Sequence, residues 1–279
     1  MKLLKFATAA FVSLAFTSAT FAASTKDIVT GAMTELMINK DLAAIDKYFA
    51  APYIQHNQSV PDGIAGLKGL AGAAIANNPA FKYQLTRVMT DGDIGITHGI
   101  YTGFGKVPLV GFDVFRVKDG KIVEHWDNLS PQVANNPSGH SQTDGPVIVS
   151  DIENTAANKA VVSDFVSNVL IKGAFDKMPN YFDGDNYIQH NSNIADGLSG
   201  LGAGLKMLAD TGVTMRIAKV HAVHGEGNFV LAMSSGDISG QPTAFFDLFR
   251  VENGKIAEHW DVISPILPDA KAANTNGKF

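Results

Sequence analysis

Apolar residues recur at helical spacing early in the chain and then alternate with polar residues at a period of two. Between residues 26 and 38 the apolar side chains fall on one face, which predicts an amphipathic helix. We expect a second short helix over residues 41–49, ended by Pro52, and a glycine-rich third helix over residues 63–76. A short extended segment, residues 53–57, separates these two helices.

The alternating part of the chain predicts an antiparallel sheet. Turn residues stand between the apolar runs, most clearly at Asp91-Gly92-Asp93 and at Lys118-Asp119-Gly120-Lys121. The strand candidates are residues 81–89, 94–101, 110–117 and 122–129. Three helices followed by such a sheet indicate an α+β unit.

This pattern occurs twice in the chain. Tyr53-Ile54-Gln55-His56-Asn57 recurs letter for letter as residues 187–191, an offset of 134 (187 − 53). The same offset carries Glu124-His125-Trp126-Asp127 onto residues 258–261. A period this long indicates a duplicated domain, because solenoid repeats run to roughly 20–50 residues. We expect domain 1 over residues 24–131, a linker over 132–152, domain 2 over 153–267 and a tail over 268–279.

The second copy is expected to repeat the order of elements. Its helix candidates are residues 156–171, 173–182 and 197–209, and its strand candidates are residues 215–223, 229–234, 243–251 and 256–263. The linker is rich in Asn, Pro, Ser, Gly and Thr, which is typical of a segment with little core.

Composition narrows the classes of partner. The 279 residues carry a net charge of −5 and no cysteine, so two domains fit the length and each can close a core without disulfides. The acidic balance and the lack of a Lys/Arg cluster argue against nucleic acid or a polybasic membrane contact. A neutral small molecule is the expected partner.

The first 22 residues resemble a secretory signal peptide. Lys2 and Lys5 precede a short apolar run, and Thr20-Phe21-Ala22 places small residues where a signal peptidase cleaves, after Ala22. The run is shorter than the roughly 20 residues of a membrane span. We therefore expect a periplasmic or secreted protein; an uncleaved amphipathic helix is the alternative.

Several repeated motifs carry a family resemblance. They are Tyr-Ile-Gln-His-Asn, Asp-Gly-x-x-Gly-Leu, Phe-Asp-x-Phe-Arg-Val and Glu-His-Trp-Asp. On these motifs the chain resembles a tandem of SnoaL-like domains. That family lies in the nuclear-transport-factor-two-like (cystatin-like cone) superfamily, with polyketide cyclases and ketosteroid isomerase. More specifically, the chain is similar to predicted SnoaL-like aldol-condensation enzymes.

The resemblance implies the fold and the assembly. Each domain would be a cystatin-like cone, with three N-terminal helices packed on a curved antiparallel sheet around a conical pocket. Members of the superfamily commonly dimerise through the outer face of the sheet. The two copies are therefore expected to form an intramolecular pseudo-dimer, with a homo-oligomer as the alternative.

Strand geometry limits which side chains share the pocket. His56 lies on one face with Ile54, and Tyr53, Gln55 and Asn57 lie on the other. A three-residue hairpin loop would oppose Asp113 to His125, with Asp127 on the same face, whereas a two-residue loop would oppose Asp113 to Trp126. The sequence leaves this register open. The resemblance to ketosteroid isomerase places Asp113 and Asp247 in the pocket and favours His125 and Asp127.

The resemblance places the catalytic base near His56 and Asn57, where the steroid enzyme has a carboxylate. Neutral His56 or Asp127 would remove a proton next to a carbonyl. Protonated Asp113, Asn57 or Tyr53 would stabilise the enolate oxygen. The expected catalytic residues are His56, Asp113, His125, Asp127, His190, Asp247, His259 and Asp261. The expected substrate-binding residues are Tyr53, Asn57, Phe115, Trp126, Tyr187, Asn191, Phe249 and Trp260.

Other roles for these residues remain open. Asp113 would pair with Arg116 or Arg87, and His56 would be a hydrogen-bonded core histidine, if the set were structural. His56, His125 and Asp127 would form a metal set if they converged, but no local spacing supports it, so neither metal nor cofactor is expected. The function predicted is a cofactor-independent lyase, isomerase or cyclase acting on a small carbonyl compound. The alternative is a non-catalytic periplasmic binding protein for a small hydrophobic ligand.

Overall fold

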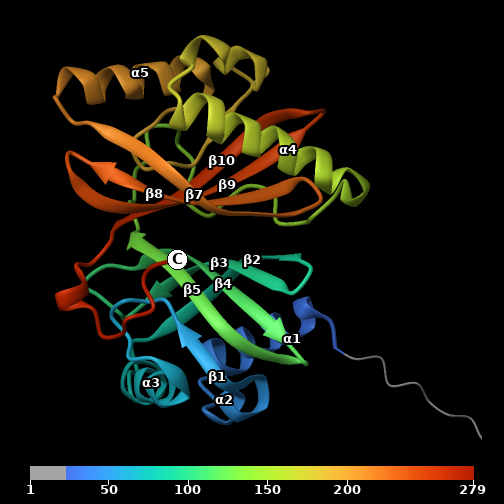
Figure 1. Cartoon of the computed structure of the whole chain (residues 1–279), viewed down its shortest axis with the longest axis vertical. Helices are drawn as coiled ribbons and strands as arrows, with labels where there is room; N and C mark the ends of the chain where they lie inside the picture. The colour runs from blue at the N-terminus through green and yellow to red at the C-terminus, as the bar shows by residue number, and fades with distance from the viewer. Residues whose placement is uncertain (1–22) are drawn as a thin grey trace, which may run out of the picture.

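The computed structural model describes residues 23–279 as an α+β protein with two five-stranded sheets, each covered by helices on one face (Figure 1). The expected signal peptide, residues 1–22, lies outside the described residues. Within the described part of the chain, every helix is too short or too polar to cross a membrane.

The first half begins with a capped helix. The Ser24 side chain accepts from the Asp27 amide, and the Asp27 carboxylate accepts from the Ser24 amide, which satisfies both donors. The helices of this half are α1 (Thr25–Ala32), η1 (Met33–Ile38), α2 (Ala43–Tyr48), α3 (Gly63–Leu70) and η2 (Ala71–Ala76). The strands are β1 (Phe49–Gln55), β2 (Lys82–Asp91), β3 (Ile94–Thr102), β4 (Leu109–Lys118) and β5 (Lys121–Pro131).

The strand order in this sheet is β1-β5-β4-β3-β2. Only the β1–β5 pair is parallel. Pro52 does not end the second helix as expected. That helix ends at Tyr48, and Pro52 lies within the edge strand β1, a position where a residue without an N–H is tolerated.

The second half has the equivalent sheet order, β6-β10-β9-β8-β7. Its helices are η3 (Ile152–Asn154), α4 (Thr155–Phe165), η4 (Val166–Ile171), η5 (Phe175–Asn180) and α5 (Gly197–Asp210), and η6 (Asp269–Lys271) lies in the tail. Its strands are β6 (Ile188–Gln189), β7 (Met215–Glu226), β8 (Phe229–Ile238), β9 (Gln241–Glu252) and β10 (Lys255–Pro265). The helix expected over residues 173–182 is only the short 3₁₀ segment η5, which contains Pro179.

Neither hairpin register considered from the sequence is the observed one. Lys118 pairs with Lys121 around a two-residue turn, but a bulge follows, and beyond it Arg116 pairs with Glu124 and Asp113 with Asp127. The extra residue in β5 shifts the pairing by one, so that the side chains beyond the bulge point to the opposite face from the one a regular two-residue hairpin would give. As a result Asp113, His125 and Asp127 share one face, and the second half repeats this arrangement.

The hydrophobic core has three parts. One lies under the helices of each half, and the third lies between the outer faces of the two sheets, which pack against each other (Figure 1). Side chains from both halves form this third cluster, among them Ile96, Phe112, Phe246 and Trp260. The two sheets are thus one packed unit rather than two separate bodies.

The segment after each copy crosses to the other copy. The linker brings the Ser141 carbonyl within 2.7 Å of His190 Nδ1, and the tail brings the Gly277 carbonyl within 3.1 Å of His56 Nδ1. Gln142 in the linker is buried, so this segment contributes more packing than its composition suggested. Each crossing segment thus contacts the equivalent histidine of the other copy, His190 or His56.

Candidate active site

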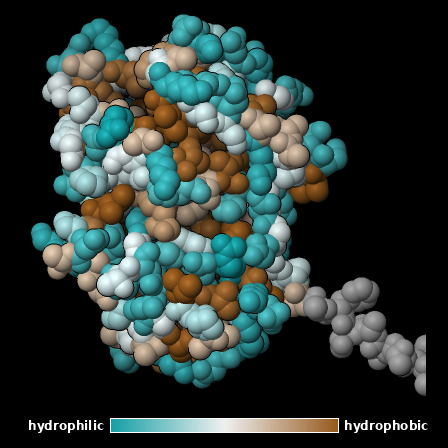
Figure 2. Space-filling view, in the orientation of Figure 1, coloured by the Kyte–Doolittle hydropathy of each residue, from teal (hydrophilic) through white to brown (hydrophobic). Residues whose placement is uncertain are grey.

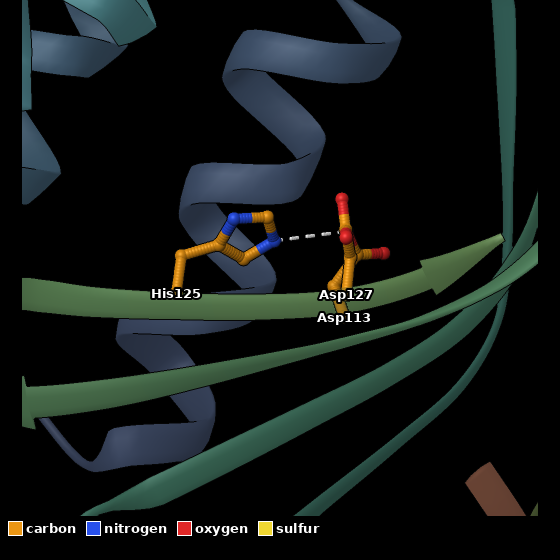
Figure 3. A group of neighbouring side chains, drawn as sticks. All are labelled: Asp113, His125 and Asp127. Atoms are coloured by element: carbon orange, nitrogen blue, oxygen red, sulfur yellow. Dashed lines mark hydrogen bonds and ion pairs between the residues drawn. The ribbon is translucent and has the colours of Figure 1, made fainter. Parts of the chain in front are cut away.

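The helix-covered face of each sheet carries a buried Asp–His–Asp set. In the first half, β4 supplies Asp113 and β5 supplies His125 and Asp127, all on the side of the N-terminal helix (Figure 3). Nε2 of His125 lies 3.2 Å from Oδ1 of Asp113. In the second half, Nε2 of His259 lies 3.1 Å from Oδ1 of Asp247, with Asp261 beside them.

A glutamine fixes the tautomer of each imidazole. Gln55 Oε1 lies 2.9 Å from His125 Nδ1 and also accepts from the main-chain N–H of Asn57 at 2.9 Å. Because that N–H can only donate, the atom it meets must be the amide oxygen, so Nδ1 of His125 carries a proton and donates it. Gln189 holds His259 in the same way, also at 2.9 Å. Nε2 is therefore the atom that exchanges a proton with the carboxylates.

An asparagine holds the second carboxylate of each set. Asn57 Nδ2 donates to Asp127 Oδ2 at 2.5 Å, and Asn191 Nδ2 donates to Asp261 Oδ2 at 2.5 Å. Tyr53 and Tyr187 are buried on the same face, and burial raises the pKa of both phenols. The Tyr187 oxygen accepts from Gln189 Nε2 at 3.1 Å, so the tyrosine supports the glutamine.

Burial and charge shift two pKa values in the second half. Burial raises the pKa of Asp261, and the neighbouring Asp247 charge raises it further against the opposing effects of His259 and Asn191. Burial alone would lower the pKa of His259, but its hydrogen bond to Asp247 and the charges of Asp261 and Asp247 outweigh this and raise it. Burial and charge thus raise the pKa values of both Asp261 and His259.

Two hydroxyls and a lysine contact the carboxylates of the first set, whereas the second set has no such contacts among the described residues. Tyr101 and Thr97 both donate to Asp113 Oδ2. Lys278 in the tail donates to the Asp127 carbonyl at 2.7 Å, and its ammonium lies 3.6 Å from the Asp127 carboxylate. No described residue of the second half supplies an equivalent lysine or hydroxyl contact to Asp261 or Asp247.

His56 and His190, expected as catalytic bases, lie on the opposite face. His56 Nε2 is 3.0 Å from Glu124 Oε1, and its ring stacks on Trp126 at 4.9 Å. Alternation along β1 sends Gln55, rather than His56, toward the Asp–His–Asp set. The expected set is therefore corrected: these histidines are buried structural groups on the side where the sheets meet.

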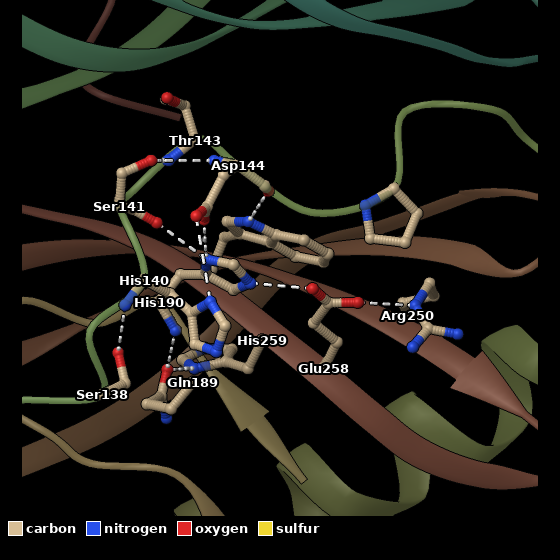
Figure 4. A network of polar contacts seen from close by, with 12 residues as sticks. Ser138, His140, Ser141, Thr143, Asp144, Gln189, His190, Arg250, Glu258 and His259 are labelled. Atoms are coloured by element: carbon tan, nitrogen blue, oxygen red, sulfur yellow. Dashed lines mark hydrogen bonds and ion pairs between the residues drawn. The ribbon is translucent and has the colours of Figure 1, made fainter.

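The second half shows this separate network most clearly (Figure 4). His190 Nε2 lies 2.8 Å from Glu258 Oε1, and Glu258 Oε2 accepts from Arg250 at 2.7 Å. His190 Nδ1 lies 2.8 Å from the Asp144 carboxylate of the linker. This chain of ionic groups ties the linker to the second sheet.

The aromatic residues expected at the site divide between the two faces. Phe115 stacks on His125 and Phe249 on His259, each with ring centroids 4.8 Å apart. Trp126 and Trp260 lie on the other face; Trp260 stacks on His190 at 4.5 Å. Both tryptophans are thus corrected from pocket wall to packing between the sheets.

Neither arginine considered as a partner of Asp113 reaches it. Arg116 pairs with Glu124 at 2.9 Å and with Asp93 at 3.0 Å. Arg87 donates to carbonyl oxygens of the linker instead. The contacts of Asp113 are His125, Thr97 and Tyr101, so its role is not that of an arginine counter-ion.

The metal set considered from the sequence does not converge, because His56 faces away from His125 and Asp127. Each Asp–His–Asp set does place three ligand atoms within 4.8 Å of one another, the groups best suited to a cation among the described residues. Hydrogen bonds within the protein already account for most of these atoms. We therefore interpret both sets as acid/base groups.

Two open pockets lie away from these sets. One of about 550 Å³ is lined by the linker, α4 and the β9–β10 hairpin, and another of about 290 Å³ lies between α2 and α3. The Asp–His–Asp residues are 5–9 % exposed. Each set therefore lies on the helix-covered face of its sheet and is buried by the surrounding side chains and helices.

Sequence reasoning missed three kinds of site residue. Gln55 and Gln189 belong to the repeated motif and share a face with the asparagine, which was the signal available for them. Tyr101 stood in a predicted strand without a repeated counterpart. Lys278 carried no signal, since its contact with Asp127 joins residues 151 positions apart.

Known proteins match parts of the chain. Residues 30–125 match the family model of the SnoaL-like domain. No curated protein sequence matches the chain.

Similar solved structures include wild-type IdmH from Streptomyces antibioticus, with 18% identity over 39% of this chain and 93% of that one, at a TM-score of 0.34. TsrD from Streptomyces laurentii has 18% identity over 37% of this chain and 88% of its own, at 0.33. An NTF2-like protein of unknown function from Mesorhizobium loti has 21% identity over 39% and 95%, at 0.33. The family match agrees with the repeated motifs, and residues 30–125 form a SnoaL-like domain.

Proposed function

We propose that the chain is an exported pair of cone domains that acts as a cofactor-independent acid/base enzyme on a small carbonyl compound. The observation that carries the proposal is the buried imidazole whose Nδ1 is fixed by a glutamine and whose Nε2 faces a carboxylate. Such an arrangement prepares one nitrogen to take up and return a proton. The family match supports a SnoaL-type enzyme, and the reaction is our inference.

The residues of the second half illustrate the chemistry. Neutral His259 would remove a proton next to the substrate carbonyl at Nε2, and Asp247 would stabilise the imidazolium that forms. Asp261, whose pKa is raised by burial, would keep its proton on Oδ1 while Asn191 bonds Oδ2, and would donate to the enolate oxygen. Return of the proton to another carbon gives isomerisation, and return of a solvent-derived proton to the α-carbon gives exchange.

Two further proposals complete this picture. The packed outer faces of the sheets and the reciprocal crossing of linker and tail support an internal pseudo-dimer of the two copies. Export rests on residues 1–22 and is tested by the mass of the mature protein: cleavage after Ala22 is expected, and an intact Met1 would remove the proposal.

The alternative function is a binding protein for a small hydrophobic ligand. It is favoured by the first set, in which Tyr101, Thr97 and Lys278 satisfy both carboxylates without a substrate. Ligand that copurifies in native mass spectra without turnover would support this alternative.

Deuterium exchange at the α-carbon tests the enzymatic proposal. Acetone, cyclohexanone and acetophenone would be followed by NMR with wild-type protein and with the double variant His125→Gln, His259→Gln. We expect the double variant to exchange at the buffer rate. The matched control, His56→Gln with His190→Gln, removes two buried histidines of the other face and should retain exchange if it folds. Exchange that survives in the first double variant would remove the imidazoles as bases.

A further inference from the structure

Two oxygens of the second half, of which that of Ser234 is the fully buried one, have no hydrogen-bond partner among the described residues. Ser234 is fully buried, and its Oγ has no hydrogen bond within the described residues. Asp247 bonds His259 through Oδ1, while no described residue donates to its Oδ2. A buried polar atom without a partner is costly, so Ser234 Oγ points to a group that binds beside it.

Register places both oxygens on the helix-covered face. Asp247 pairs with Ala232 across β8 and β9, and Ser234 follows Ala232 by two residues. Residues two apart in a strand share a face. The neighbours Val230 and Ala232 belong to the core under the helices, which confirms that this face points inward.

The first half fills the equivalent positions with its own hydroxyls. Gly99 stands where the second half has Ser234, and a Cβ there would lie 2.6 Å from the Tyr83 hydroxyl oxygen. Tyr101 and Thr97 donate to Asp113 Oδ2. The pairing of strands puts Ile217, Ala232 and Gly236 in the places of Tyr83, Thr97 and Tyr101. The second half has thus lost every hydroxyl that bonds the first carboxylate.

The third helix also covers the second half less completely. In the first half, α3 buries its Leu67 and η2 buries its Ala71 and Ile75, whereas α5 buries only its glycines 197 and 204. Leu198 and Leu201 of α5 stay partly buried at the edge of the core. Figure 2 shows apolar side chains gathered in a hollow on the upper half of the molecule, which is the second half in Figure 1.

We propose that the second half, and not the first, binds a small neutral hydroxyl compound with an apolar body: an alcohol or a phenol. Its O–H would donate to Asp247 Oδ2, and its oxygen would accept from Ser234 Oγ. A hydroxyl is the group that can do both at once. An anion would face two carboxyl groups, and the apolar rim favours an uncharged body. This inference rests on the proposed function in taking the helix-covered face as the ligand site.

Phenol and its methyl ether, anisole, test the inference on the full mature chain by calorimetry and saturation-transfer NMR. We expect phenol to bind at least tenfold more tightly than anisole, which lacks the donor. Ser234→Ala and Asp247→Asn should each weaken phenol binding by about tenfold. Thr86→Ala is the matched control, because it removes another unpartnered buried hydroxyl, in the first half, and should leave phenol affinity unchanged.

Equal binding of phenol and anisole, or phenol binding unaffected by Ser234→Ala, would overturn the proposal. Absence of phenol binding would do the same and would leave a bound water as the partner of Ser234. Ser234→Ala is nearly isosteric, so the folded variant remains available for this comparison. Phenol binding without ketone exchange would reject the proposed enzyme alone, and exchange without phenol binding would reject this inference alone.

Discussion

The two halves share a strand order and an Asp–His–Asp set, yet they differ in what surrounds that set. In the first half Tyr101, Thr97 and Lys278 contact both carboxylates from within the chain. Among residues 23–279 the second half has no corresponding contacts, and Ser234 is left without a partner. This difference is the basis of our proposal that the second copy, rather than the first, binds a ligand.

The outer faces of the sheets differ as well. Arg87 of the first half is buried, stacks over Trp260 with 4.3 Å to the ring centroid, and donates to the carbonyls of Pro146, Thr143 and Asp144. Burial lowers the pKa of Arg87 to about 10. Ala222 stands at the equivalent position of the second half. The first half therefore supplies, through Arg87, the hydrogen bonds that hold the linker in place.

The largest effect on stability is expected from removing the Arg87 side chain. Arg87→Met should lower the free energy of unfolding by about 3 kcal/mol, because it leaves buried carbonyls without donors. Urea unfolding of the variant measures this. Arg216→Met, at an exposed arginine of β7, is the control and should cost less than about 1 kcal/mol through its surface pair with Asp237. Equal losses in the two variants would show that Arg87 has no special role.

The next effect concerns the glutamines. Gln189→Leu removes the acceptor that fixes Nδ1 of His259 and should slow ketone exchange by about 10- to 100-fold. We expect the loss in kcat with KM little changed, since the glutamine acts through the imidazole. Gln55→Leu makes the same change in the first half and should slow exchange less. A larger effect of Gln55→Leu would reverse the assignment of the two halves.

A smaller effect is expected at Lys278, which contacts Asp127 of the first set. Lys278→Met should lower the free energy of unfolding by about 1–2 kcal/mol, because the Asp127 carbonyl loses its donor and the carboxylate loses its cation. Thermal unfolding measures the change. Lys271→Met, at an exposed lysine of the same tail, is the control. An unchanged melting temperature in Lys278→Met would show that the tail does not stabilise the first set.

The smallest effect is a change in pH dependence. The pKa of Asp261 is raised above its ordinary 3.8, so the folded state binds this proton more tightly than the unfolded state. The stabilisation is complete below pH 3.8 and is lost as the pH rises through the raised pKa. Asp261→Asn lacks this loss, so its melting temperature relative to wild type should rise across that window. A difference that stays constant with pH would contradict the raised pKa.

Much of this arrangement could be predicted from the sequence. The duplication and the α+β class follow from repeated motifs and strand alternation, and the family resemblance favoured the common face of Asp113, His125 and Asp127. The register did not follow, because the bulge beside Val117 adds a residue that no turn motif announces. Alternation separated His56 from Gln55 but left open which of the two faces inward.

Contacts between distant segments were beyond sequence reasoning. Lys278 reaches Asp127, and the linker carbonyls reach Arg87, only because the two copies pack together and exchange their C-terminal segments. The loss of the first-half hydroxyls in the second half needs the pairing of β7, β8 and β9, since bulges shift β7 against its counterpart. Motif repeats therefore revealed what the copies share, and packing revealed how they differ.

Ketone exchange in two single variants tests the central claim most directly. If proton transfer belongs to the second half, His259→Gln should reduce deuterium exchange to the buffer rate, while folded His125→Gln should keep most of the wild-type rate. Equal losses in both variants, or loss in His125→Gln alone, would contradict this account.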